Sequence, residues 1–266
     1  MKRAFSTLCC INYTAEEIVE LAKNNNLQVE LRADDNNVEN FFGKKELFEN
    51  ANVKIINIAA SISIIGEDIS EKAYRYIDLA ENLNAKGVRI FAGKSPQTFQ
   101  NEIISDIEGI IKGIKKLCEY GKSKNVEIWL ETHSELSTGK LCKRILDGVN
   151  MDNLKIIWDV LHSIEYKEAI SDTVKYLGDK IVHVHLKDAV PPEDMNMCQY
   201  VHTDLGAGVL PFEEVISALE TMDFNGYLSL EWESPWRPEI RNLYPDPNVL
   251  LEKYNNVLDK AYNNVI

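Results

Sequence analysis

The sequence lacks an apolar run long enough to cross a membrane, and it lacks an excess of basic residues. None of its apolar stretches reaches the roughly 18 residues that identify a candidate membrane span. Among 266 residues, 29 are Lys or Arg and 42 are Asp or Glu, which gives a formal net charge of −13 at pH 7. Such a surface repels phosphate backbones, and no Lys/Arg cluster offsets it. We therefore expect neither a membrane protein nor a nucleic-acid-binding protein.

Cysteine is also scarce, with five residues and no C-x-x-C pair. An odd, small number of cysteines in a chain of this size favours reduced thiols over a disulfide framework. The first residues, MKRAFSTLCC, include no long apolar stretch followed by a small-residue cleavage site, so we predict no signal peptide and a cytoplasmic location. The 45% of hydrophobic and 27% of charged residues are ordinary values for a folded globular protein.

Short β-rich runs alternate with segments of helical periodicity along the whole chain. The expected strands are at 4–10, 27–31, 53–59, 87–91, 126–131, 154–158, 181–186 and 226–231. Expected helices include 14–25, where Thr14 and Glu17 form a capping-box pattern, and 68–83, 101–122 and 211–222. Strict alternation of eight strands with eight helices predicts parallel strands, and units of about 33 residues are typical of a (β/α)₈ barrel.

We therefore predict an α/β fold with a single (β/α)₈ TIM-barrel domain over residues 1–266. The competing architecture is a doubly wound open sheet, which usually has a glycine-rich first strand-to-helix turn. That turn is CCINYT here and contains no glycine. The longest irregular segment, at 188–208 after the seventh strand, is expected to be a lid or a binding loop.

Ionisable residues interrupt the apolar strands, mostly where the strands end. Strands of a parallel barrel are covered on both faces and should be nearly continuous apolar runs, so these exceptions are informative. They are Arg32, Arg89, Glu131, His133, Asp159, His162, His183, His185, Lys187, Asp188, Glu231 and Glu233. Parallel strands bring these ends to one rim, where barrel enzymes have their active sites.

Three acidic residues and one histidine from four consecutive strands would converge at that rim. They are Glu131, Asp159, His185 and Glu231. Carboxylates this close cannot all stay ionised without compensation, because each uncompensated buried charge costs several kcal/mol. One divalent cation would compensate them; oxygen-rich ligation with one imidazole suits Mn²⁺, with Mg²⁺, Co²⁺ and Zn²⁺ as alternatives. The opposing interpretation is a structural network in which Arg32, Arg89 and Lys187 pair with the carboxylates.

In chain order, these strand ends resemble the motifs of the xylose isomerase-like barrel family of sugar isomerases and epimerases. The motifs are WLETH, W-D-x-x-H, H-x-H-L-K-D, G-x-G and L-E-W-E, and the acidic and histidine positions 131, 159 and 185 are 28 and 26 residues apart. The similarity extends from VELR near residue 30 to EWE near residue 232. In that family the equivalent Glu, Asp, His and Glu bind one divalent metal, which implies four ligands here: Glu131, Asp159, His185 and Glu231.

The resemblance also implies aldose–ketose isomerisation or ketose epimerisation of a small sugar or polyol. A metal chelated by the substrate carbonyl and a neighbouring hydroxyl would stabilise the enediolate that forms when the adjacent proton is removed. Glu131 and Glu231 are expected to exchange that proton from opposite faces of the substrate, as acid and base. The residues expected to contact the substrate are His162, Lys187, Arg32 and His133.

Other rim residues are expected to have different roles. His183 is interpreted as a hydrogen-bonded core histidine, and Glu233 as solvated or paired with Arg237. Trp236, on a rim loop, is a candidate to stack on a sugar face. A homo-oligomer is an open alternative, with Trp232, Trp236 and residues 241–248 as candidate interface.

Three rival functions are weighed against the isomerase. An inosose-type dehydratase or lyase of cyclic polyols would use the same metal and base for elimination. An abasic-site endonuclease shares the later motifs but needs histidines from earlier strands, and this chain has none before His133. Where that branch has D-x-H, this chain has Tyr200-Val201-His202. A non-catalytic sugar-binding barrel is disfavoured by the complete ligand set.

Overall fold

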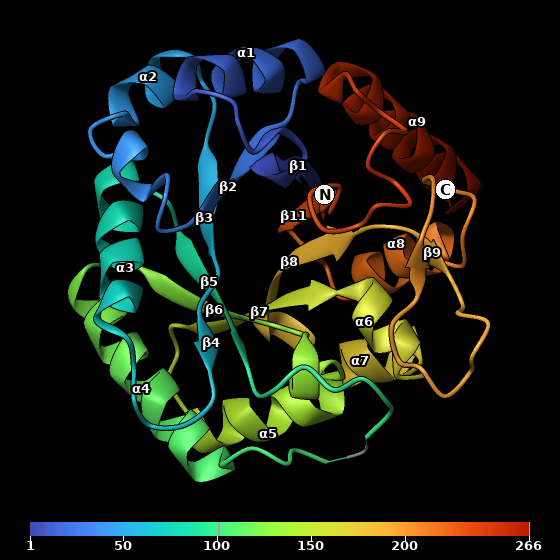
Figure 1. Cartoon of the computed structure of the whole chain (residues 1–266). Helices are drawn as coiled ribbons and strands as arrows, with labels where there is room; N and C mark the ends of the chain where they lie inside the picture. The colour runs from blue at the N-terminus through green and yellow to red at the C-terminus, as the bar shows by residue number, and fades with distance from the viewer. Residues whose placement is uncertain (101, 266) are drawn as a thin grey trace.

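The computed structural model describes residues 1–100 and 102–265, and it shows a closed ring of parallel strands surrounded by helices (Figure 1). The barrel strands are β1 (Lys2–Ser6), β2 (Gln28–Ala33), β3 (Ile55–Ala60), β5 (Gly87–Ala92), β6 (Glu127–Glu131), β7 (Leu154–Asp159), β8 (Ile181–Leu186) and β11 (Tyr227–Leu230). Each strand pairs in parallel with the next in this order, and β1 closes the ring by pairing with β11. The predicted (β/α)₈ TIM barrel is confirmed.

Helices cover the outside of the ring. They are α1 (Ala15–Asn25), α2 (Lys45–Asn50), α3 (Glu71–Leu83), α4 (Ile107–Ser123), α5 (Gly139–Val149), α6 (Val160–Glu165), α7 (Ile170–Leu177), α8 (Phe212–Thr221) and α9 (Pro247–Val265). The expected alternation of one helix per strand is wrong after β7, which is followed by both α6 and α7. The physical reason is that Asp159, the last residue of β7, caps α6 at once by accepting the N–H of His162.

The first helix shows how local sequence sets the boundaries. Thr14 accepts the N–H of Glu17, and the Glu17 carboxylate accepts the N–H of Thr14, so the predicted capping box is present. Ile18 and Leu21 are buried on the barrel side of the helix. The helix ends at Asn26, whose φ of 53° is a left-handed conformation that asparagine tolerates.

Three expected boundaries are wrong. The first strand ends at Ser6 because Thr7–Cys10 forms a short 3₁₀ helix, η1, whose buried apolar residues resemble a strand in sequence. The helix expected at 68–83 begins at Glu71. The helix expected at 101–122 begins at Ile107, because Asp106 caps it by accepting a backbone N–H three residues on. Residue 101 itself lies outside the described residues.

The strands alternate between two environments with the period of two that pleating imposes. On β2, Val29 and Leu31 are buried in the apolar layer shared with the helices. Glu30 instead reaches the histidines of β8 inside the ring, and Arg32 follows on the same inner side. The interior therefore carries charge toward the carboxyl ends of the strands. A small apolar cluster that includes Trp129 fills it at the other end.

The long segment after β8 is organised by one carboxylate. It contains the two-stranded hairpin β9 (Ala189–Val190) and β10 (Val201–His202). Asp188 accepts backbone N–H groups at 2.9 to 3.0 Å from four residues: Ala189, Gly206, Gly208 and Leu210. Gly206 has a φ of +82°, and a Cβ at Gly208 would lie 2.2 Å from the Asp188 carboxylate. Both glycines are therefore required by this turn.

Candidate metal centre

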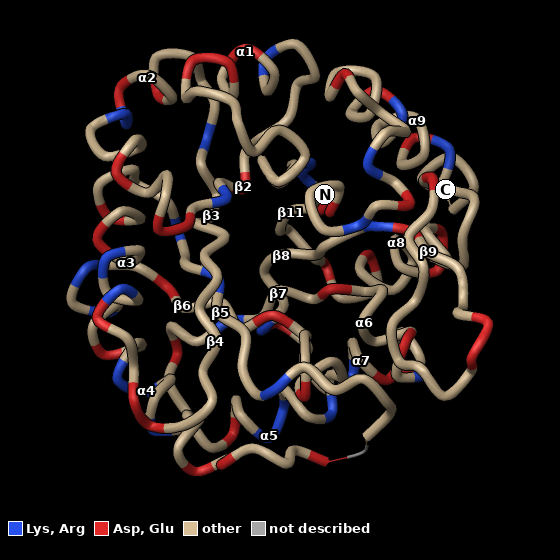
Figure 2. Tube along the Cα trace, in the orientation of Figure 1, with Lys and Arg blue, Asp and Glu red and all other residues tan. Residues whose placement is uncertain are grey.

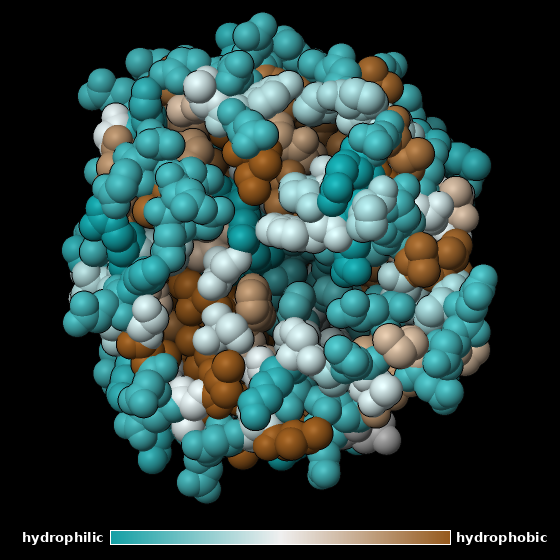
Figure 3. Space-filling view, in the orientation of Figure 1, coloured by the Kyte–Doolittle hydropathy of each residue, from teal (hydrophilic) through white to brown (hydrophobic). Residues whose placement is uncertain are grey.

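Four side chains meet at the carboxyl ends of four consecutive barrel strands. They are Glu131 at the end of β6, Asp159 at the end of β7, His185 on β8, and Glu231 directly after β11. One ligand-type atom from each lies within 4.8 Å of the others, and all four residues are buried. Figure 3 shows this face of the molecule with a central hollow in which hydrophilic residues lie deep.

His185 is held in one orientation by a carboxylate on the opposite side of the barrel. Its Nε2 lies 2.9 Å from Oε2 of Glu30, while its Nδ1 lies 2.8 Å from Oε1 of Glu131 and 3.5 Å from Oε2 of Glu231. Burial lowers the pKa of His185, but the surrounding carboxylates outweigh it and raise that pKa well above its usual value. An Nε2–H held by Glu30 would leave Nδ1 available to bind a cation in place of its proton.

Two cations lie among the acids. Lys187 Nζ lies 2.7 Å from carboxylate oxygens of both Asp159 and Glu231, and 2.5 Å from Glu233. Arg89 Nη1 lies 3.0 Å from Glu231 and 3.4 Å from Glu131. The opposing interpretation of a structural rim network is thus realised for Arg89 and Lys187. It is wrong for Arg32, which forms no ion pair with any described carboxylate.

Two oxygens of the cluster have ion-pair contacts with these cations but no hydrogen bond in the described part of the chain. Oε2 of Glu131 and Oδ2 of Asp159 are buried and make no hydrogen bond within the described residues, although Lys187 and Arg89 lie at ion-pair distance. Burial, assisted by the charges of Glu231 and Glu131, raises the pKa of Asp159 and outweighs the opposing effect of His162 and Lys187. Three carboxylates, two of which have an oxygen without a hydrogen bond to any described residue, and one oriented imidazole form a donor set that fits a divalent cation.

Two further histidines lie beside the cluster. Nδ1 of His162 is 2.7 Å from Oε2 of Glu165, while its Nε2 is 3.8 Å from Oδ2 of Asp159 and has no hydrogen bond within the described residues. Burial lowers the pKa of His162, but Asp159 and Glu165 outweigh it and raise it to about 9. His133 packs edge-on against His162 with ring centres 4.8 Å apart, and burial together with His162 lowers its pKa to about 4.

The remaining rim residues are placed as follows. His183 is buried with Nε2 3.0 Å from Glu30, and Glu233 pairs with Arg237 at 3.0 Å, as well as with Lys187. Trp236 is 53% exposed and lies over Arg32. Trp232 is 2% exposed, so its candidacy as an interface residue is wrong: it packs inside the molecule against residues of the rim loop.

Sequence reasoning missed Glu30 and Glu165, the carboxylates that hold the two site histidines. Glu30 lies within its strand, whereas the other rim residues were recognised by their places at strand ends. Glu30 and Arg32 are two residues apart, which places both on the same inner face of the strand. This spacing could have identified Glu30 as a residue of the site. Glu165 lies three residues after His162, a spacing that places two side chains on one helical face.

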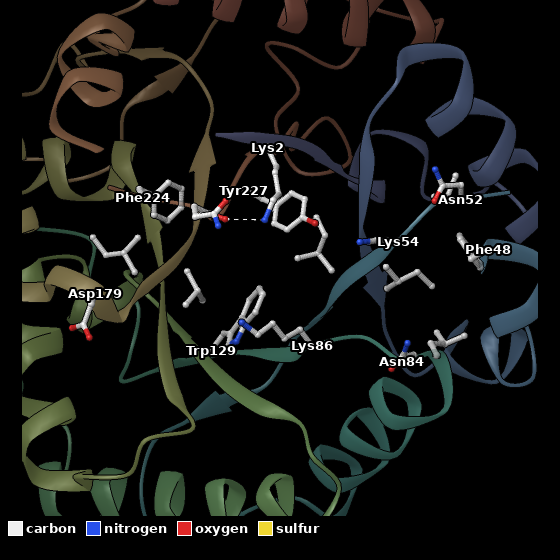
Figure 4. Close-up of a pocket in the computed structure, with 18 of the residues that line it drawn as sticks. Lys2, Phe48, Asn52, Lys54, Asn84, Lys86, Trp129, Asp179, Phe224 and Tyr227 are labelled. Carbon is white, nitrogen blue, oxygen red and sulfur yellow. Dashed lines mark hydrogen bonds between the residues drawn. The ribbon is translucent and has the colours of Figure 1, made fainter. Parts of the chain in front are cut away.

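A second hollow lies at the opposite, amino-terminal end of the barrel (Figure 4). It has a volume of about 760 Å³, and Trp129 and Tyr227 form part of its lining. Its basic and acidic lining residues are all exposed and balance one another: Lys2, Lys54, Lys86, Glu49, Asp179 and Asp223. These exposed, oppositely charged groups have the environment of ordinary surface residues, unlike the buried cluster at the carboxyl end of the barrel.

Residues 10–252 match the profile of the xylose isomerase-like TIM barrel family. The chain belongs to this family. The resemblance inferred from the strand-end motifs is therefore confirmed.

No helix in the described parts of the chain has the length and apolar character that a membrane crossing requires. In Figure 2, Lys and Arg positions are dispersed among Asp and Glu positions around the outer helices.

Relatives within the family include an isomerase and dehydratases. Hydroxypyruvate isomerase of Escherichia coli is 21% identical over 188 residues, which cover 68% of each chain. Inosose dehydratase 2 of Bacillus cereus is 24% identical over 216 residues, covering 71% of this chain and 72% of the relative. The crystal structure of IOLI protein with a bound zinc atom superposes with a TM-score of 0.79 at 19% identity, covering 98% of this chain and 99% of that one. The structural likeness supports the fold.

Proposed function

We propose that the chain is a divalent-metal-dependent isomerase or epimerase that moves a proton on the carbon beside a carbonyl group of a sugar or sugar derivative. The observation that carries the proposal is the buried cluster of three carboxylates and one oriented imidazole, with two carboxylate oxygens left without hydrogen bonds. Such a cluster is costly unless a cation completes it. Its place at the carboxyl end of the barrel is where enzymes of this fold carry out chemistry.

The residues that would hold the cation are Glu131, Asp159, His185 and Glu231. Mn²⁺ is the ion we expect, because oxygen ligands predominate and a single imidazole is present. The zinc atom bound to IOLI protein supports a divalent ion in a barrel of this fold. When bound, the cation would polarise a carbonyl oxygen and stabilise the negative charge that develops as the neighbouring C–H proton leaves.

Glu131 and Glu231 are proposed to exchange that proton. Burial raises the pKa of Glu231, but Lys187 and His185 outweigh it and lower that pKa, which keeps the carboxylate ionised and ready to accept a proton. The same cations weaken its basicity. A substrate oxygen that draws Lys187 or Arg89 away from Glu231 would restore basicity at the moment of reaction, so we assign both cations to substrate oxygens as well.

His162 and His133 are proposed to contact the substrate at the mouth of the site. The orphaned Nε2 of His162 is buried beside Asp159 and is free to bond a substrate oxygen, because Glu165 holds the other ring nitrogen. His133 packs against that ring and limits its movement. Fixed hydrogen-bonding groups of this kind place the reacting carbon against the base, which is where much of the rate enhancement arises.

Dehydration of a cyclic polyol is the second candidate, and the same histidine favours it. Elimination needs a proton donor for the departing hydroxyl in addition to the base. The His162–Glu165 pair has the geometry of an oriented donor, with a 2.7 Å bond fixing the ring. The inosose dehydratase relatives support this alternative.

Exchange of substrate hydrogen with solvent tests the proposal. The protein would be stripped with a chelator, reloaded with Mn²⁺, Co²⁺, Mg²⁺ or Zn²⁺, and incubated in D₂O with ketoses, aldoses and inososes while deuterium incorporation is followed by NMR. We expect metal-dependent incorporation without loss of water for an isomerase or epimerase, and loss of water for a dehydratase. Exchange that persists in the chelator-treated protein would refute the role of the metal.

Glu131→Gln should abolish the exchange, whereas its thermal unfolding curve should still be that of a folded barrel. The matched control is Glu119→Gln, which makes the same change at an exposed position of α4. Full exchange activity in Glu131→Gln would contradict the acid/base assignment.

A further inference from the structure

Arg32 is a buried cation that has only neutral partners. It lies on the inner side of β2 at the mouth of the site and is 6% exposed. Its Nη1 donates to the carbonyl oxygen of Ala59 at 3.2 Å, and its Nη2 donates to the hydroxyl of Ser61. Its Nε is buried and has no partner within the described residues. Three of the five N–H donors of the guanidinium are therefore unused.

The other cations of this face are neutralised. Arg89 and Lys187 pair with the acids of the metal centre, and Arg237 pairs with Glu233. The acids of the metal centre are engaged by these cations or by the histidines, and no described carboxylate forms an ion pair with Arg32; Glu231, Asp34 and Glu30 act on its charge only from further away. Burial, and then the charge of Arg89, lower the pKa of Arg32 to about 10. An uncompensated charge inside a protein is costly, so a purely structural residue here would be better uncharged.

An aromatic ring lies beside this guanidinium. The Arg32 guanidinium carbon lies 5.3 Å from the centre of the Trp236 ring, which comes from the loop after β11. A cation–π contact stabilises the charge of the arginine without using any of its N–H donors. A planar fork with free N–H groups matches a carboxylate or a phosphate, which accept two parallel hydrogen bonds.

We propose that Arg32, with Trp236 stacked over it, is the anion-recognition site of the catalytic centre, and that the substrate carries a carboxylate or phosphate group. The inference rests on the proposed function and narrows it to acidic sugar derivatives and hydroxy-keto acids. Trp236 then acts on the arginine, in place of the sugar-face stacking expected from sequence. The negative charge of the substrate would balance the positive charge of Arg32, with which no described carboxylate pairs.

Ligands that share a carbon skeleton but differ in whether they carry a carboxylate or phosphate group test the proposal. Calorimetric titration of the Mn²⁺-loaded protein would compare dihydroxyacetone with hydroxypyruvate and dihydroxyacetone phosphate, and glucose with glucuronate and glucose 6-phosphate. We expect at least one acidic member to bind ten times more tightly than its neutral counterpart. The member that does so distinguishes a carboxylate from a phosphate. Equal binding within both sets, or binding by no acidic member, would overturn the proposal.

Variants attribute the preference to Arg32. Arg32→Met should reduce the acid-over-neutral ratio to within about twofold, and Arg32→Lys should give an intermediate ratio, because an ammonium keeps the charge without the fork. Arg237→Met removes an arginine that already has a carboxylate partner and should leave the ratio unchanged. If Arg32→Met does not fold, the ratio in Arg32→Lys decides. An unchanged ratio in the Arg32 variants would refute the assignment.

The failure of this inference is distinguishable from the failure of the proposed function. Metal-dependent deuterium exchange on neutral sugars with no preference for acids would leave the function standing and overturn the role of Arg32. An Arg32-dependent preference for acids without metal-dependent exchange would support the anion site and overturn the proposed chemistry.

Discussion

Replacing Glu30 by glutamine should weaken metal binding without removing any of the four proposed ligands. The carboxylate is fully buried, and its Oε2 lies 2.9 Å from Nε2 of His185, 3.0 Å from Nε2 of His183 and 3.0 Å from Nδ2 of Asn57. Burial raises the pKa of Glu30, but the two histidines outweigh it and hold that pKa well below the usual range. Glutamine keeps the shape of the side chain but loses the charge.

The magnitude follows from the role of such a partner. A carboxylate that accepts the second N–H of a ligating histidine fixes the ring and raises its basicity, and its loss typically costs 10- to 100-fold in affinity. That corresponds to about 1.4 to 2.7 kcal/mol. We expect Glu30→Gln near the upper end, because the carboxylate is fully buried and one of its oxygens contacts both His183 and His185.

The assay is titration of the stripped protein with Mn²⁺ in competition with a chelator, followed by calorimetry. Glu20→Gln, an exposed position on α1, removes the same charge far from the barrel interior and serves as the control. A change of less than twofold in Glu30→Gln would show that packing alone orients His185, and that the Glu30 charge contributes nothing to metal affinity.

Three further outcomes are expected. Lys187→Met leaves a cluster of buried carboxylates without its ammonium, so the metal-free protein should lose about 3–5 kcal/mol of unfolding free energy. Saturating Mn²⁺ should restore most of it, and equal loss with and without Mn²⁺ in thermal unfolding would contradict shared neutralisation. Asp188→Asn orphans two backbone N–H groups and should cost about 2–4 kcal/mol in denaturant unfolding; a midpoint equal to that of the exposed control Asp152→Asn would count against it. Because the pKa of His185 is raised well above its usual value, a proton competes with the metal. Mn²⁺ affinity should therefore rise with pH, with proton release in calorimetry, and a constant affinity between about pH 6 and 8 would exclude this competition.

The barrel could be predicted because its signals are local. The capping box at Thr14 and the alternation of apolar strands with amphipathic helices are both readable within short windows. The end of the first strand could not be predicted, because Thr7–Cys10 is as apolar and buried as the strand before it. Whether these four residues continue the strand or turn into a 3₁₀ helix depends on their contacts with β2, which is remote in sequence.

The features of the candidate site also divide into those that could be predicted from the sequence and those that could not. Glu131 and Asp159 could be proposed as ligands because strand ends meet at one rim whatever the details of packing. The pairing of cations with acids could not be predicted, because it depends on which side chain reaches which oxygen. The three cations Arg32, Arg89 and Lys187 occupy similar strand-end positions in the sequence, but in the structure Arg89 and Lys187 pair with carboxylates and Arg32 pairs with none of the described ones.

The turn organised by Asp188 has a consequence for how the family can diversify. One carboxylate ties down the backbone where the segment after β8 leaves the barrel and where it returns. Between these two ties, Met197 and Cys198 pair with residues 97 and 98 of a neighbouring loop, so residues 191–196 are the part of the segment where length and composition can change while Lys187 stays in position. A change of that kind would leave the Asp188 turn and the buried cluster beside it intact.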